Sequence, residues 1–118
     1  METGTQIAEI PGKAQPISEQ HARELWVSLA SLLRSYTAAH GLNGTTQATV
    51  ELGDDEIRVR CGQRWLRLAR TGGRIEGTTQ DGQRFGLFWS EAGELLTETG
   101  DGLPMDLQAE EWSRELVA

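Results

Sequence analysis

The sequence predicts an α+β fold in which a long N-terminal helix packs on one face of an antiparallel β-meander of five or six strands, followed by a short C-terminal helix. Three observations lead to this fold class. Apolar residues recur at three- and four-residue steps between residues 18 and 41, apolar and polar residues alternate between glycine-containing turns from 45 to 99, and a second apolar stripe follows residue 104. Because short turns join consecutive strands, we expect local hairpins rather than parallel βαβ units.

The chain is long enough for one domain with a single core and too short for two ordinary domains. We expect residues 17–118 to form this domain and residues 1–16 to form an N-terminal arm. The arm contains two glycines and two prolines and shows no sustained periodicity. It holds at most a short extended piece around residues 6–10.

Residues 18–41 carry the signals of one long helix. Ser18 is a good N-cap, and Gly41 stands where a C′ glycine is expected. At about 1.5 Å per residue such a helix reaches roughly 33 Å, enough to cross a sheet diagonally. The residues of its apolar stripe are Ala22, Leu25, Trp26, Leu29, Leu32, Leu33 and Tyr36.

The stretch from Glu56 to Arg70 is the centre of the predicted sheet. Two alternating runs flank Gly62-Gln63, and glycine at the first position of a two-residue loop suits a type II′ hairpin. One face of this hairpin is apolar, and the other is basic with an indole. The expected cross-strand pairs are Val59 with Leu66 and Ile57 with Leu68 on the apolar face, and Arg60 with Trp65 and Arg58 with Arg67 on the other.

The neighbouring strands extend this alternation in both directions. A four-residue turn at 53–56 keeps Ala48, Val50 and Leu52 on the apolar face, because a slip of one residue would invert the strand. On the other side, a turn at 71–74 pairs Arg70 with Ile75.

The hairpin at Asp81-Gly82 has two possible registers. A two-residue type I′ loop would place Phe85, Leu87 and Trp89 on the basic face and leave an exposed apolar patch there. A three-residue loop with a glycine bulge would place them in the core. We favour the bulge, because it buries three large side chains.

The C-terminal part is predicted as a weak edge strand at 94–99, a loop at 99–104 and a short helix capped by Asp106. The narrow apolar stripe of this helix consists of Met105, Ala109, Trp112 and Leu116. The sequence leaves open which sheet face the helix covers. If Trp112 packs beside the first helix, the basic face remains available for binding.

Charge is distributed unevenly along the chain. The formal net charge is −7, yet residues 58–84 hold seven arginines and two acidic residues, which gives this segment +5 and the remainder −12. One interpretation is that acidic flanking elements pair with the basic hairpins within the domain or across a dimer. The other is an exposed anion-binding face of the sheet.

No catalytic, metal or cofactor motif stands out, so we expect a protein without enzymatic activity and without a cofactor. Cys61, His21 and His40 lack the close spacing of a metal site. By alternation Cys61 points inward, as a small core residue does, although Arg64 beside it could activate a thiol. The glycine pairs lack the spacing of a phosphate-binding loop.

These residues favour a protein-interaction module, expected to be a homodimer, that uses the basic outer face of the sheet or an edge strand. Tryptophan and arginine dominate binding hot spots. The alternative is an anionic ligand or single-stranded nucleic acid on the same face, which the acidic net charge disfavours. A single cysteine, no visible signal peptide and no membrane-spanning run predict a cytoplasmic protein. The candidate binding residues are Arg58, Arg60, Trp65, Arg67 and Arg84.

Overall fold

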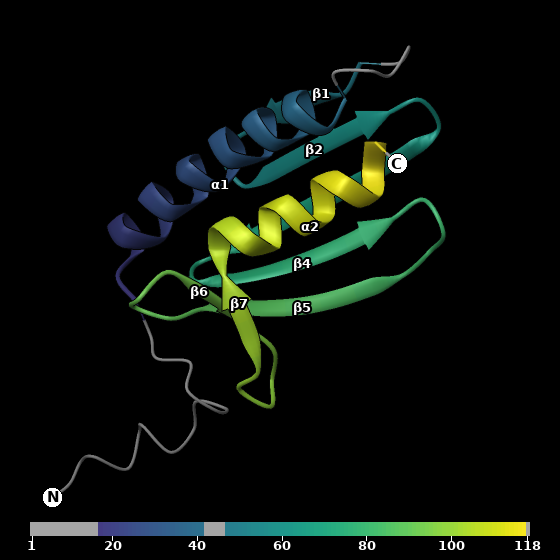
Figure 1. The fold of residues 1–118 in the computed structure, drawn as a ribbon. Helices are drawn as coiled ribbons and strands as arrows, with labels where there is room; N and C mark the ends of the chain where they lie inside the picture. Colours follow the sequence, from purple (N-terminus) through teal and green to yellow (C-terminus); the bar gives the residue numbers. More distant parts are fainter. Residues whose placement is uncertain (1–16, 42–46, 118) are drawn as a thin grey trace, which may run out of the picture.

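The computed structural model describes residues 17–41 and 47–117 and confirms the α+β class (Figure 1). Its seven antiparallel strands follow each other across the sheet in chain order, whereas five or six were predicted. The predicted arm at 1–16 lies outside the described residues. The elements are α1 Glu19–His40, β1 Thr49–Leu52, β2 Glu56–Cys61, β3 Arg64–Thr71, β4 Arg74–Thr79, β5 Arg84–Trp89, β6 Glu94–Leu96, β7 Gly102–Pro104 and α2 Met105–Val117.

Both helices lie on the same face of the sheet, next to each other (Figure 1). The core forms between this helix layer and the inward-facing residues of the strands. Trp112 of α2 belongs to that core together with Trp26 and Leu29 of α1. Within the described ranges, the opposite face of the sheet therefore has no helix over it.

The predicted start of α1 is confirmed, and its end differs in detail. The Ser18 hydroxyl accepts a hydrogen bond from the backbone N–H of His21 at 3.0 Å, which is the expected N-cap. Gly41 is the C-cap residue, with φ −95°, and its N–H donates to the Thr37 carbonyl. It does not take the left-handed conformation of the predicted C′ glycine.

The centre of the core is an aromatic pair. Trp26 meets Trp89 of β5 edge to face, with the ring centroids 6.0 Å apart. The indole N–H of Trp26 donates to the carbonyl of Gly53 in the β1–β2 turn at 3.3 Å. Trp26 thus joins the helix both to β5 and to the first turn of the sheet.

The register of the central hairpin is as predicted. Val59 pairs with Leu66 and Ile57 with Leu68 on the helix side, and the four predicted polar and aromatic partners pair on the other side. The loop contains two residues, with Gly62 at φ +65°, as a primed hairpin turn requires. The predicted four-residue turn at 53–56 and the pairing of Arg70 with Ile75 are also confirmed.

The β4–β5 hairpin adopts the favoured bulge. Thr78 pairs with Arg84, Thr79 and Gln83 close the loop, and Gly82 has φ +83°. This register turns the Phe85 ring toward α2, where it stacks on Trp112 with the centroids 5.7 Å apart.

Gly77 is the partner of Phe85 in that register, and a larger residue there would displace the Phe85 ring. A Cβ atom at this position would overlap the Phe85 ring. The glycine therefore makes room for the ring against which α2 packs.

The C-terminal region differs most from the prediction. Residues 102–104, predicted as loop, form the edge strand β7, and β6 ends at Leu96 rather than 99. A three-residue strand containing glycine and proline has none of the composition that identifies strands in a sequence. Asp106 lies within the first turn of α2 instead of capping it, and its carboxylate accepts from the Leu107 N–H.

A candidate interaction surface on the open face of the sheet

Strand alternation divides the seven arginines of the basic segment between the two faces of the sheet. Arg64 and Arg70 share the inward parity of Leu66 and Leu68, and both bind groups of the helix layer. The other five project from the face that neither helix covers, which we call the open face, and are exposed. These are Arg58, Arg60, Arg67, Arg74 and Arg84.

The register sets most of these residues in a row across the strands. Arg58 of β2 is the partner of Arg67 of β3, which is followed by Thr78 of β4 and Arg84 of β5. Trp65 pairs with Arg60 in the next row. All five predicted binding residues therefore lie on one face, in two adjacent rows.

Four of the five predicted residues line one shallow hollow of about 490 Å³. Arg58, Arg60, Trp65 and Arg67 are joined there by Glu51 of β1. The Trp65 side chain is half-buried, so part of the indole is available for contact. We call this hollow the Trp65 hollow.

Arg84, the fifth predicted residue, lines a smaller hollow on β4 and β5. Its volume is about 230 Å³, and Arg74 and Glu76 also line it. Arg84 therefore lies in the row of Arg58 and Arg67 but outside the Trp65 hollow.

The face neutralises part of its own charge through glutamates of the same strands. The Glu56 carboxylate accepts a hydrogen bond from the Arg67 guanidinium and pairs with Arg58 at 3.3 Å. The hydrogen bond from Arg67, with a smaller contribution from Arg58, holds the pKa of Glu56 below its ordinary value.

At the other end of this face Arg74 pairs with Glu76 at 3.4 Å and stacks over the Phe88 ring at 5.5 Å. Arg60 and Trp65 are cross-strand partners as predicted, whereas the cation–π contact found among the described residues joins Arg74 and Phe88.

Arg60 and Arg84 have no carboxylate partner within salt-bridge distance among residues 17–41 and 47–117. The acidic residues that flank the basic segment pair with other arginines: Glu19 of α1 and Asp55 of the first turn with Arg70, and Glu56 with Arg58 and Arg67. Pairing within the domain thus compensates the charge of Arg70, but it leaves part of the positive charge of the open face without a partner.

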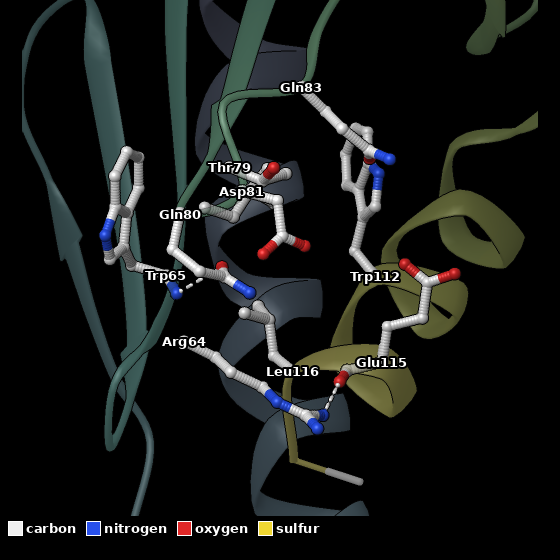
Figure 2. A pocket seen from close by; sticks show the side chains of 10 residues that line it. Arg64, Trp65, Thr79, Gln80, Asp81, Gln83, Trp112, Glu115 and Leu116 are labelled. Carbon is white, nitrogen blue, oxygen red and sulfur yellow. Dashed lines mark hydrogen bonds between the residues drawn. The ribbon is translucent and has the colours of Figure 1, made fainter.

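A second hollow, which sequence reasoning missed, opens at one end of the sheet beside the last turn of α2 (Figure 2). Its volume is about 390 Å³. The Arg64 guanidinium donates a hydrogen bond to the backbone carbonyl of Glu115 at 2.7 Å, and a cation is favourable there because it lies at the C-terminus of a helix. The side-chain oxygen of Gln80 accepts a hydrogen bond from the backbone N–H of Trp65 at 2.9 Å. Only the docking of α2 creates this hollow, so strand patterns give no signal for it.

The structure adds nothing in favour of metal or thiol chemistry. Among the described residues no group of three or more histidines, cysteines and acidic residues is placed to hold a metal ion. Cys61 is half-buried and pairs with Arg64 across the hairpin, as predicted. The imidazole Nε2 of His40 lies 3.6 Å from the carboxylate of Glu110 on α2. In the described part of the chain, neither helix is long and apolar enough to span a membrane.

Comparisons with known proteins found no similarity: no family model matches the sequence, and neither a curated protein nor a solved structure matches the chain.

Proposed function

We propose that this protein is a non-enzymatic protein-interaction module that binds a partner protein through the open face of its sheet. The observation that carries the proposal is the placement of both helices on one face, while Trp65 and the exposed arginines lie on the other. A half-buried tryptophan surrounded by arginines is the composition of a binding hot spot.

The nucleic-acid alternative has less support. Three glutamates, Glu51, Glu56 and Glu76, lie among the five arginines on strands β1 to β5, and a polyphosphate, which carries a negative charge at every nucleotide, cannot avoid them. The chain as a whole is acidic as well. A protein segment can instead place apolar atoms on Trp65 and carboxylates on the arginines.

The partner should be lost when this face is altered and retained when the helix layer is altered. We expect the double variant Arg60→Ser, Trp65→Ser to lose at least one partner that wild type captures from an extract of its own source cells. Arg34→Ser is the matched control, because it removes an exposed arginine from α1. Mass spectrometry of the captured proteins measures the difference. Equal capture by wild type and the double variant would contradict the proposal.

Self-association, predicted from the sequence, has a separate candidate surface at the β1 edge. Of the three large aliphatic side chains that are exposed in the described part of the chain, two lie beside this edge: Val27 of α1 is 53% exposed and Leu52 of β1 is 37% exposed, and both line a hollow of about 420 Å³. β1 has no neighbour on its outer side among the described strands. At the opposite edge β7 contains Pro104, which cannot donate a backbone hydrogen bond.

Val27→Glu is expected to weaken such a dimer at least about tenfold, because a two-fold axis repeats the substitution in both copies. Leu107→Glu makes the same change at an exposed leucine of α2. Light scattering over micromolar concentrations measures the mass. A wild-type chain that is monomeric throughout, or a Leu107→Glu variant that dissociates equally, would count against the β1 edge.

Neither catalysis nor a cofactor is part of this proposal. The cytoplasmic location stays a prediction from the single cysteine.

A further inference from the structure

We propose that the open face binds an acidic, extended segment of another protein, and that Glu56 occupies the place of one of its carboxylates in the free protein. This inference rests on the proposed function and adds the chemistry of the partner.

The contacts of Glu56 show that the neighbouring arginines bind a carboxylate. Its carboxylate lies between the guanidinium groups of Arg58 and Arg67 and interacts with both. Such charge-assisted contacts are stronger than neutral hydrogen bonds. All three side chains are at least 30% exposed, so a carboxylate from solution can reach the same two arginines. An incoming carboxylate would therefore compete with Glu56 for existing contacts.

Further positive charge continues along the face. Arg60 borders the Trp65 hollow, and Arg84 lies at the far end of the row that begins with Arg58. Neither has a carboxylate within salt-bridge distance in the described ranges. Arg58 and Arg84 stand three strand spacings apart, or roughly 14 Å, which equals about four residues of extended chain. A short segment crossing the strands could contact this whole row.

Charge complementarity selects this occupant over a second copy of the same face. On strands β1 to β5 this face carries five arginines against three glutamates, so two copies packed face to face would bring together two surfaces of positive net charge, which is unfavourable. An acidic segment instead gains from every arginine that Glu56 and Glu76 leave without a partner. Trp65, half-buried in the hollow, offers an apolar contact for one side chain of that segment.

Synthetic peptides test the partner chemistry directly. The probe is a fluorescein-labelled nine-residue peptide with glutamate at every second position and leucine at the centre; its control has glutamine in place of each glutamate. We expect full-length protein to bind the acidic peptide, to lose affinity between 50 and 300 mM salt because exposed charges are screened, and not to bind the glutamine peptide. Fluorescence anisotropy gives the dissociation constants.

The substitution Glu56→Gln tests the role of Glu56. It removes the competing carboxylate and keeps the shape, so the acidic peptide should bind roughly five- to tenfold more tightly. Glu24→Gln, an exposed position on α1, makes the same change in net charge and should leave affinity nearly unchanged. Arg60→Ala should weaken binding by a similar factor without disturbing Glu56. Thermal unfolding of each variant verifies that it is folded.

Three outcomes would overturn the inference: no binding of the acidic peptide by wild type or Glu56→Gln, equal tightening by Glu24→Gln, or binding of a twelve-nucleotide oligothymidylate in place of the peptide. Failure here differs from failure of the proposed function. A partner captured through Arg60 and Trp65 would still establish the interaction module, with a partner of other chemistry.

Discussion

The Trp26→Ala variant is expected to lose about 3–5 kcal/mol of unfolding free energy, the range for truncating a large buried aromatic residue. Trp26 is 2% exposed, meets Trp89 edge to face and donates a hydrogen bond to Gly53. Its removal opens a cavity between α1 and the sheet and leaves the turn carbonyl without this donor. The loss would take away a large share of the stability of a domain of this size.

Urea unfolding followed by circular dichroism measures this loss. Trp26→Phe should retain most of the ring packing and lose only about 1–2 kcal/mol, because it gives up the hydrogen bond and some volume. Trp65→Ala is the comparison on the open face, where a half-exposed ring contributes less to folding. A Trp26→Ala variant as stable as Trp65→Ala would contradict the assignment of Trp26 to the core.

Arg70→Ala is expected to destabilise the protein by about 2–4 kcal/mol, since hydrogen bonds to charged groups contribute about 1.5–3 kcal/mol each and are partly recovered by water. The Arg70 side chain is only 3% exposed, and its guanidinium donates to Glu19, Asp55 and the Gly72 carbonyl. It thereby ties the start of α1 to two turns of the sheet. Arg70→Met should lose less, because the methionine keeps the packing of the aliphatic stem.

The same contact predicts how stability depends on pH. The hydrogen bond from Arg70, followed by that from Arg23, lowers the pKa of Glu19 from its ordinary value of 4.5. A lowered folded-state pKa means that this contribution is complete above about pH 4.5 and is lost as the pH falls through the folded-state value. As the pH is lowered from 7 to 3, the urea midpoint of Arg70→Met should therefore decrease less steeply than that of wild type. Parallel curves would show that Arg70 does not act through Glu19.

Strand parity made most of the fold and the candidate surface predictable from the sequence. Ile57, Val59, Leu66 and Leu68 alternate so regularly that a shift of one residue would expose all of them. Once they face the helices, Arg58 and its outward neighbours must share the other face.

Features that depend on tertiary docking were not predictable. Arg70 has the inward parity of Leu68, yet its burial requires Glu19, which lies far away in the sequence. The hollow beside α2 and the side of the sheet that α2 covers depend on Trp112 meeting Phe85. A short strand such as β7 forms because β6 pairs with it, rather than through its own propensity.

The chain order of the strands bears on how the protein folds. Each strand has its partner next to it in the sequence, so every step of sheet assembly closes only a short loop. Low contact order favours rapid folding, and we expect the meander to assemble without waiting for distant segments. The contacts between distant segments come from the helices: α1 reaches α2 and Trp89, α2 reaches Phe85 and Arg64, and the final docking of the two helices would then complete the core.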